Sequence, residues 1–355
     1  EKAKPRKMNP PPHGIIPVGE YGGKTRYVLK AAEKGQLSLE TARLVCKKCN
    51  RQLFAYKCEC GNRAELLYTC NSCGKTGDSE KCSCGSKATP YYRTIVDLGK
   101  EVRRASGELR IRPEQKTKGI IGMMNRNKYF EPIEKGLLRA HHGVFVFKDG
   151  TVRFDATNLP ISHFRPSELG LSVEKARELG YTHDVKGEKL TDPTQLCELF
   201  PQDMIIPEDS AEYMLGTAKF VDDLLEKFYG LPRYYNAKTR EDLVGQLTIY
   251  LAPHISVGVL GRIIGFTRAR GTYAHHYLHV ATRRDCDGDE NAFMLMLDAL
   301  LNFSKKYLPA SRGGTMDAPI VLTIKLDPRE VDDQVHEMDI VNQYPLEYYN
   351  LCEKI

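Results

Sequence analysis

The chain has 355 residues, 41% of them hydrophobic and 28% charged, a composition that excludes a disordered or fibrous protein and suggests roughly two to four folded domains. No run approaches the ~20 apolar residues of a membrane span, and the charged, proline-rich start lacks the apolar stretch of a signal peptide, so we expect no membrane contact. The chain begins at Glu1 rather than Met, and we interpret it as a piece of a longer protein.

Positive charge is concentrated in the first third of the chain. Residues 1–120 carry 25 Lys and Arg against 12 Asp and Glu, whereas the remainder carries 27 against 34. Such a basic region favours contact with a polyanion such as nucleic acid, although a solvated lysine-rich surface would give the same count.

The predicted elements, in chain order, start with an irregular stretch over 1–25, because Pro10, Pro11 and Pro12 cannot continue a helix or join a central strand. One or two helices are expected over 26–45. A β-hairpin is expected over 143–155, where two β-rich runs flank Asp149-Gly150.

An amphipathic helix is expected over 207–229, capped by Asp209 or Ser210 and ended by Gly230. Three strands are expected over 246–251, 257–266 and 277–282. An apolar helix over 291–307 and a strand over 318–324 complete the prediction.

Eight cysteines form an internal repeat. Each unit has a Cys-x-x-Cys pair followed, after the same interval in both units, by a Cys-x-Cys pair and a glycine. The units are Cys46, Cys49, Cys58 and Cys60, and Cys70, Cys73, Cys82 and Cys84. Paired thiolates at these spacings are typical of structural four-cysteine zinc sites, so we expect two Zn²⁺ ions.

Other interpretations of the cysteines stay open. Pairing within each repeat is favoured, but an interleaved pairing, an iron–sulfur cluster or a disulfide framework would use the same residues. Because eight of the cysteines have the spacing of metal ligands, we expect a reducing, cytoplasmic location. The remaining cysteines, Cys197, Cys286 and Cys352, are expected to be ordinary core thiols.

The segment Arg283-Arg284-Asp285-Cys286-Asp287-Gly288-Asp289-Glu290 holds three carboxylates at alternate positions, with a glycine that permits a tight bend. Such carboxylates can converge on one or two divalent ions, and oxygen ligands suit Mg²⁺. A solvated helix N-terminus is the simpler alternative for Asp289 and Glu290. A calcium loop of the EF-hand type is excluded, because the sixth and twelfth positions hold Glu290 and Met296 in place of Gly and Glu.

Several stretches around this loop resemble the large, catalytic subunit of archaeal family D DNA polymerases, and the resemblance covers nearly the whole chain. The matching stretches are residues 6–13, 251–254, 258–266, 283–290, 297–304, 313–319 and 327–333. In that family the acidic motif usually begins with Asn, whereas this chain has Asp285, which leaves open whether Asp285 is a direct ligand.

The resemblance implies an α+β fold: a double-psi β-barrel catalytic core with inserted zinc-ribbon-like four-cysteine modules and flanking helices. We expect a basic N-terminal segment of the core over 1–42, the two zinc modules over 43–92, a mixed α/β accessory region over 93–235 and the barrel with the acidic loop over 236–355. The implied partners are a DNA primer-template and dNTP, a small exonuclease subunit and a sliding clamp.

The resemblance also implies the site residues. Asp287 and Asp289, with Asp285, would hold two Mg²⁺ ions, while Lys4 and Lys7 match catalytic lysines that bind the triphosphate or stabilise developing charge. Arg283, Arg284, Lys116 and Lys118 are the expected nucleic-acid contacts. Weaker candidates for the role of Lys4 and Lys7 are Lys116, Lys118 and Lys135. His275, His276 and His279 are expected to serve packing or nucleic-acid contact rather than metal binding.

The predicted function is therefore DNA-directed DNA polymerase activity, in which a primer 3′-hydroxyl attacks the α-phosphate of a dNTP. Two alternatives stay open: an RNA polymerase-like nucleotidyltransferase, which Asp285 slightly favours, and a non-catalytic zinc-dependent module that only binds nucleic acid.

Overall fold

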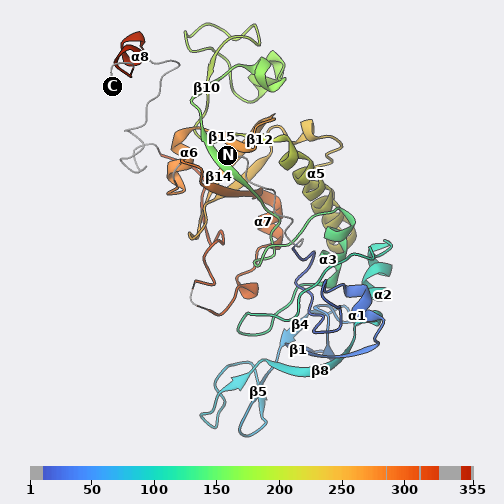
Figure 1. Ribbon diagram of the computed structural model, residues 1–355. Helices are drawn as coiled ribbons and strands as arrows, with labels where there is room; N and C mark the ends of the chain where they lie inside the picture. The colour runs from blue at the N-terminus through green and yellow to red at the C-terminus, as the bar shows by residue number, and fades with distance from the viewer. Residues whose placement is uncertain (1–10, 285, 312, 328–344, 353–355) are drawn as a thin grey trace.

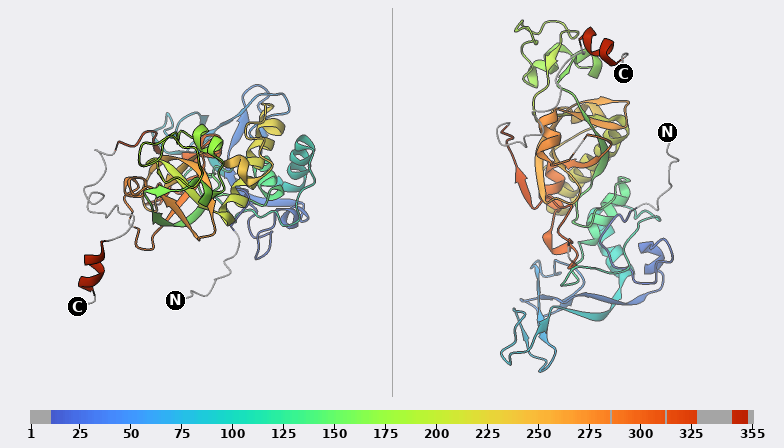
Figure 2. Two further views of the ribbon diagram at one scale, coloured as in Figure 1. Left: turned by 90° about the horizontal axis from the view of Figure 1, so that it is seen from above. Right: turned by 60° about the vertical axis from the view of Figure 1, so that its left-hand side comes forward.

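The computed structural model describes residues 11–284, 286–311, 313–327 and 345–352. The fold mixes helices and strands in an elongated arrangement of three parts (Figure 1). A β-barrel lies in the middle, a small lobe around β10 covers one end, and the cysteine region around β5 lies at the far end; Figure 2 shows the same order from a second direction.

The barrel closes on itself through a mixed set of strand pairings. Its strands follow in the order β12 (Asp203–Pro207), β15 (Gly271–Ala274), β9 (Phe154–Pro160), β16 (Glu290–Leu295), β13 (Leu247–Leu251) and β14 (Val257–Thr267), and β14 pairs back with β12. The β12–β14 and β15–β9 pairs are parallel and the other neighbours are antiparallel. This closed six-stranded barrel and the cysteine clusters described below confirm the expected fold class.

The barrel draws strands from a wider stretch of sequence than 236–355. Strands β9 and β12 come from the region between residues 93 and 235, and β17 (Val321–Thr323) adds to the outside of β14 in parallel. The barrel core consists of buried apolar side chains, which include Met204, Tyr250, Val259, Ile263 and Phe293.

Helix α5 (Glu208–Asp223) joins the barrel to the N-terminal region. Its first half contributes Ala211 and Met214 to the barrel core, and its second half contributes Phe220 and Val221 to a separate core. The helix continues with π-type hydrogen bonding over Leu224–Tyr229 and ends at Gly230, whose left-handed backbone (φ 68°) supports the predicted stop.

The predicted caps of this helix are wrong. Pro207 occupies the N-cap position, and the Ser210 hydroxyl donates back to the Pro207 carbonyl (2.6 Å) instead of accepting a backbone N–H.

The N-terminal region forms its own apolar core from short elements. These are α1 (Val28–Ala32), the antiparallel pair β1 (Gln36–Ala42) and β8 (Tyr91–Asp97), α2 (Leu98–Leu109) and α3 (Ile133–His141). The expected helices over 26–45 are therefore mostly wrong, because only one helical turn or so forms before the chain enters β1. The alternation of Leu37, Leu39 and Thr41 toward the core is a strand pattern that the sequence interpretation overlooked.

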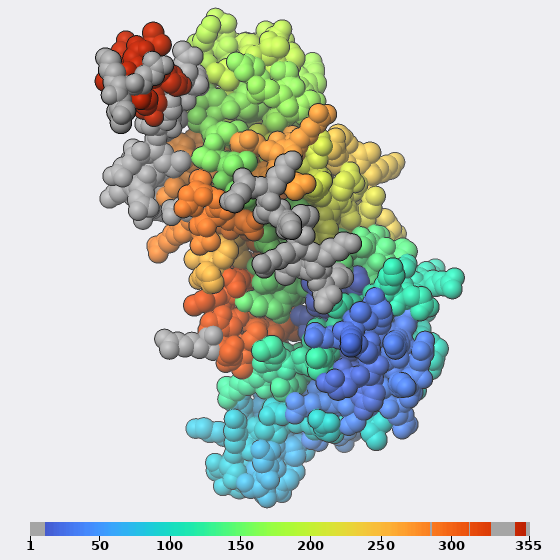
Figure 3. Space-filling view, in the orientation of Figure 1, coloured from blue at the N-terminus to red at the C-terminus, as the bar shows by residue number. Residues whose placement is uncertain are grey.

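The cysteine region contains two small antiparallel sheets of the same design. The first consists of β3 (Gln52–Leu53), β2 (Leu44–Cys46) and β4 (Ala64–Leu66), and the second of β6 (Thr76–Gly77), β5 (Tyr68–Cys70) and β7 (Ala88–Thr89). Figure 3 shows the second sheet at the extremity of the molecule, beyond the N-terminal core.

A small lobe between β9 and β12 has a core of its own. It contains β10 (His163–Phe164), α4 (Val173–Glu178), β11 (Cys197–Glu198) and a 3₁₀ turn over Pro166–Leu169. Further 3₁₀ turns cover Arg240–Leu243 and Lys305–Tyr307, and α8 (Leu346–Cys352) is the last described element.

Three further sequence predictions differ from the structure. The hairpin over 143–155 does not form. Residues 147–151 make a tight turn closed by the Phe147 N–H donating to the Thr151 carbonyl (2.8 Å), but the residues on either side are not strands, and strand pairing begins only at β9. The strand expected over 277–282 is instead helix α6 (His276–Ala281). The apolar helix expected from 291 begins only at α7 (Met296–Asn302), because residues 291–295 are buried on both faces of strand β16.

Candidate active site and metal centres

The acidic loop lies at one end of the barrel, between α6 and β16. The backbone N–H of Asn158 on β9 donates to the carbonyl of Asp289 (2.9 Å), and Leu251, the last residue of β13, pairs with Ala292 near the start of β16. Strands β9, β13 and β16 therefore converge beside the loop. Asp285 lies outside the described residues.

A buried set of polar side chains supports the loop from below. The Thr282 hydroxyl donates to the His279 carbonyl (2.6 Å), and the Asn291 amide donates to Thr282 Oγ1 (2.9 Å), which ties the two ends of the loop together. Deeper in the barrel, the Tyr250 hydroxyl lies 2.5 Å from Asn158 Oδ1 and 3.1 Å from His279 Nδ1. Buried hydrogen-bond networks of this kind rigidify their surroundings, so the loop starts from a fixed base, although Asn291 Oδ1 itself has no hydrogen-bond partner among the described residues.

The two described carboxylates of the loop have different surroundings. Asp287 is exposed, whereas Asp289 is half-buried with Oδ2 at 2.9 Å from Arg284 Nε. Gly288 between them has φ 117°, a conformation that side-chain-bearing residues avoid, so the glycine permits the bend that was expected here. The loop thus offers one open carboxylate and one held by a guanidinium, which are oxygen donors suited to a hard divalent ion.

The three histidines before the loop lie on helix α6 or at its start rather than on a strand. His275 is the N-cap, and its Nδ1 accepts from the Tyr277 N–H (3.2 Å). His279 is buried and its Nε2 lies 3.1 Å from the Leu159 carbonyl, while desolvation lowers its pKa to about 4. A neutral, hydrogen-bonded His279 has a packing role, as the sequence interpretation favoured.

The expected basic residues lie in two separate places. Arg283, with a left-handed backbone (φ 55°), and Arg284 begin the acidic loop itself. Lys116 and Lys118 belong to the N-terminal region, where the Lys118 N–H donates to His13 Nδ1 (2.9 Å) and the Lys118 carbonyl accepts from the His13 N–H (2.9 Å). Lys4 and Lys7 lie outside the described residues.

Lys135, a weaker candidate, is buried in the core. Its Nζ lies 3.4 Å from the Leu301 carbonyl of α7, and desolvation lowers its pKa to about 8. A side chain with 6% exposure cannot contact a substrate from this position without rearrangement.

Buried charge between the N-terminal region and the barrel was missed by the sequence interpretation. Arg139 is fully buried, with Nη1 at 2.7 and 2.9 Å from the Glu131 carboxylate and Nη2 at 2.8 Å from the Gly150 carbonyl. Asp298 on α7 is also buried; its Oδ2 accepts from the Val152 N–H (2.8 Å), and desolvation raises its pKa to about 6. In the sequence, this network shows only in the spacing of Arg139 and Asp298, which occupy positions where core residues would be expected.

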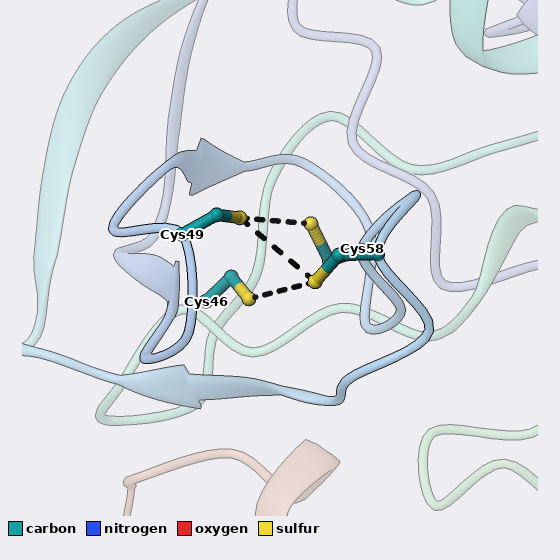
Figure 4. Close-up of side chains that lie close together, drawn as sticks. Cys46, Cys49 and Cys58 are labelled. Atoms are coloured by element: carbon teal, nitrogen blue, oxygen red, sulfur yellow. Dashed lines mark hydrogen bonds between the residues drawn. The ribbon is translucent and has the colours of Figure 1, made fainter.

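The structure brings together the four cysteines of each repeat. In the first cluster the sulfurs of Cys46 and Cys60, and those of Cys49 and Cys58, are 3.4 Å apart (Figure 4). In the second cluster the matching pairs, Cys70 with Cys84 and Cys73 with Cys82, are 3.5 Å apart. Each set of four lies within 4.8 Å, and the pairing within repeats is the one the spacing favoured.

The backbone around the two clusters repeats as closely as the sequence does. The N–H of Gly61 donates to the Cys58 carbonyl (2.8 Å), and that of Gly85 to the Cys82 carbonyl (2.9 Å). Both glycines have left-handed backbones, with φ 85° and 83°. These turns place the second cysteine pair of each unit opposite the first.

The clusters fit a tetrahedral metal ion. Four sulfurs around an ion with metal–sulfur distances of ~2.3 Å would lie about 3.8 Å apart, close to the spacing seen here. None of the eleven cysteines, all of which lie among the described residues, forms a disulfide, which argues against a disulfide framework. Hydrogen bonds from the backbone and side chain of Asn62 lower the pKa of Cys60 to about 6, and Ser86 does the same for Cys84, so these two sulfurs favour the thiolate that binds metal.

The remaining cysteines differ from the expectation of core thiols. Cys197 is buried in the core of the small lobe, as expected, but Cys286 in the acidic loop is half-buried and Cys352 on α8 is exposed. Among the described residues, the two cysteine sets are the groups of three or more ligand-type side chains close enough to share an ion. No helix in the described part of the chain is long and apolar enough to cross a membrane.

Comparison with known proteins gives a consistent result. Residues 110–355 match the family described as DNA polymerase II large subunit DP2, catalytic domain, and residues 1–79 match its central domain. Proteins named DNA polymerase II large subunit from Pyrococcus furiosus and Archaeoglobus fulgidus are 53% and 54% identical to the chain over 98% of its length. The same protein of Methanothermobacter thermautotrophicus is 49% identical over 98% of the chain.

The chain spans about a third of the length of these curated relatives. The alignment covers 28% of the Pyrococcus protein, 32% of the Archaeoglobus protein and 30% of the Methanothermobacter protein.

Proposed function

The chain belongs to the family of the DNA polymerase II large subunit, and from this premise we propose that it carries the catalytic centre of a DNA-directed DNA polymerase. The acidic loop is the observation that supports the proposal. It presents Asp287 to solvent and Asp289 at its edge from a base fixed by buried hydrogen bonds, and the catalytic-domain match includes it. The substrates are a DNA primer-template and dNTPs.

In the proposed reaction the primer 3′-oxygen attacks the α-phosphorus of a dNTP and forms a phosphodiester bond. The bond from the α-phosphorus to the bridging oxygen breaks, pyrophosphate leaves, and the hydroxyl proton passes to solvent. Two Mg²⁺ ions held by Asp287, Asp289 and Asp285 would activate the attacking oxygen and neutralise the leaving group.

The basic residues have complementary roles in this proposal. Arg284 neutralises Asp289 in the structure at 2.9 Å, and it can turn to a substrate phosphate when that carboxylate takes up an ion. Arg283 offers a second guanidinium on the same loop. We assign Lys4 and Lys7 to the triphosphate and Lys116 and Lys118 to the nucleic-acid backbone.

Zinc is the proposed occupant of both cysteine clusters. Four thiolates in a closed tetrahedral set suit Zn²⁺ and leave no open position for a substrate, so these sites serve structure. The small exonuclease subunit and the sliding clamp are proposed as partners of the whole protein, which we place in the cytoplasm.

The test uses the full-length large subunit together with its small subunit. Asp287→Ala and Asp289→Ala should each reduce Mg²⁺-dependent primer extension to background, while metal content and thermal unfolding stay unchanged. Glu290→Ala is the matched control, because Glu290 is an exposed carboxylate at the end of the same loop with no proposed role as a ligand. Extension retained in both aspartate variants would rule out the assignment, and an equal loss in Glu290→Ala would reduce it to a general charge effect.

A further inference from the structure

A cavity of about 470 Å³ opens beside the acidic loop, at the barrel end where β14 begins. The apolar part of its lining, here called the floor, comes from two elements. Ile255 lies in the turn before β14 and Val257 is the first residue of β14, while Val280 and Ala281 belong to α6. This volume falls within the range of small-molecule sites, about 300–1,000 Å³.

The rim of the cavity is charged. Arg283 and Lys325 contribute two cations and Asp327 one anion, which leaves one excess positive charge. Arg283 follows closely on the end of α6 and precedes Asp287 in the same loop, so this part of the rim belongs to the proposed catalytic loop, whereas Lys325 and Asp327 come from the segment after β17.

The first wall of the cavity is held in place by Asp317. Asp317 Oδ1 accepts the N–H of His254 (2.6 Å), whose backbone is left-handed (φ 65°), and the Asp317 N–H donates to the Ile255 carbonyl (2.9 Å). The Ser256 hydroxyl donates to the Thr315 carbonyl (2.9 Å). The stretches 251–254 and 313–319 thus brace one side of the cavity, a role that the catalytic proposal does not explain.

A second wall of the cavity is held by Gln202. Its Nε2 donates to the Leu260 carbonyl of β14 (2.7 Å) and to the Ile324 carbonyl (3.0 Å), and its Oε1 accepts the N–H of Leu326 (3.0 Å). These bonds fasten residues 324–326, which carry Lys325, to the barrel. Both walls are therefore preformed.

We propose that this cavity binds one nucleotide unit, with the base on the apolar floor and a phosphate at Arg283 and Lys325. The inference rests on the proposed function and names the ligand class of its site. A nucleotide combines a flat, largely apolar ring with an anionic group, which matches an apolar floor under a cationic rim. The unit can belong to a free dNTP or to a DNA strand, because both present the same base and phosphate.

The test narrows the cavity by mutation. Each variant is made in the full-length large subunit and assayed together with the small subunit. Val257→Phe places a ring on the floor, and Val257 is 38% exposed, so the fold has room for the change. Val321→Phe is the matched control, because Val321 pairs with Val257 in the neighbouring strand, is 55% exposed and lies outside the cavity lining. Lys325→Gln tests the rim without touching the core, and Lys305→Gln, an exposed lysine elsewhere, is its control.

Two constants are measured: the KM for dNTP in primer extension, and the Kd for a primer-template by fluorescence anisotropy without nucleotide. A free nucleotide in the cavity predicts that Val257→Phe raises the KM about tenfold, a loss of ~1.4 kcal/mol, with kcat nearly unchanged. A strand nucleotide predicts the same increase in the Kd instead. Lys325→Gln should shift the same constant in the same direction by a smaller factor.

Equal constants for Val257→Phe and Val321→Phe, together with no effect of Lys325→Gln, would overturn the inference. That result is separate from failure of the catalytic proposal, which would show as extension retained in Asp287→Ala whatever the cavity variants do.

Discussion

The two cysteine modules have the same local fold but opposite relations to the rest of the molecule. Module 1 (residues 43–66) packs against the core between the N-terminal region and the 123–146 segment, whereas module 2 (residues 67–90) extends away from it. In module 1, Leu44 is buried and Phe54 and Tyr56 pack against Phe130. In module 2 every residue from 71 to 79 is exposed.

Alignment of the two modules on their cysteines identifies the cause. The positions of Phe54 and Tyr56 in module 1 correspond to Asp78 and Glu80 in module 2. Phe54 stacks on Phe130 with ring centroids 4.5 Å apart, whereas the Glu80 side chain forms an exposed ion pair with Arg126 (2.6 Å) and the Asp78 carboxylate lies 3.9 Å from Lys47 Nζ. These two differences between the repeats explain why both modules keep their metal ligands, whereas only module 1 packs against the core.

The comparison predicts that equivalent ligand substitutions have unequal global effects. Cys58→Ser and Cys82→Ser, at matched positions, should each remove one metal equivalent from the full-length subunit. Loss of module 1 should lower the local free energy of unfolding around residues 123–146 by about 3–5 kcal/mol, because its aromatic side chains leave the core, whereas loss of module 2 should change it by less than about 1 kcal/mol.

Metal analysis and hydrogen-exchange mass spectrometry of peptides from residues 123–146 measure both effects. Equal loss of protection in the two variants would show that module 2 is coupled to the core by contacts that its exposure does not suggest.

The aromatic contact itself gives the next largest effect. Phe54→Ala should destabilise the same region by about 2–3 kcal/mol, since it removes a half-buried ring from a packed cluster. Asp78→Ala, the matched change in module 2, should stay within about 0.5 kcal/mol of the parent protein. Both variants should keep their full metal content, which separates packing from metal binding; a Phe54→Ala variant as protected as the parent would contradict the packing argument.

The sequence predicted the cysteine clusters well because their signal is local. Each ligand set lies in one short stretch, from Cys46 to Cys60 and from Cys70 to Cys84, and the glycines that close the turns stand beside the cysteines. The sequence could not rank the two modules by their contacts, because Phe130, the partner of Phe54, lies far away in the chain, beyond β8 and α2. A comparison of Phe54 with Asp78 would have suggested the difference.

The barrel was less predictable because its strands are defined by pairing. Strands β13 and β14 were predicted nearly in full, but residues 291–295 looked helical, since both faces of β16 are buried there and the alternation is lost. Residues 277–281 contain β-prone types yet form α6, because the chain must turn from β15 to the acidic loop. The roles of Asp287 and Asp289 as Mg²⁺ ligands remain predictions. The position of their loop at the end of the barrel supports these roles, and the sequence alone did not reveal that position.

A hydrogen bond from Tyr56 accompanies the aromatic contacts of module 1. The Tyr56 hydroxyl donates to the Phe130 carbonyl, and burial by neighbouring groups raises the pKa of this tyrosine well above its usual value. Tyr56→Phe should therefore destabilise the contact by about 1–2 kcal/mol, as is usual for a lost buried hydrogen bond, without loss of metal. Protection of the amides at 129–131 against hydrogen exchange reports the change, and unchanged protection would mean that ring packing alone carries this contact.

The smallest expected effect concerns the ion pair that reaches module 2. Arg126 and Glu80 are 63% and 39% exposed at the side chain, so water and salt screen their attraction, and such pairs contribute at most about 1 kcal/mol. Arg126→Ala should change protection over 123–146 by less than that amount, and the difference should vanish in high salt. Arg51→Ala is the control, because Arg51 makes a similar exposed pair with Glu59 (2.9 Å) inside module 1. A larger, salt-independent effect of Arg126→Ala alone would mean that module 2 docks on the core through this residue, and the contrast between the modules would then be one of degree.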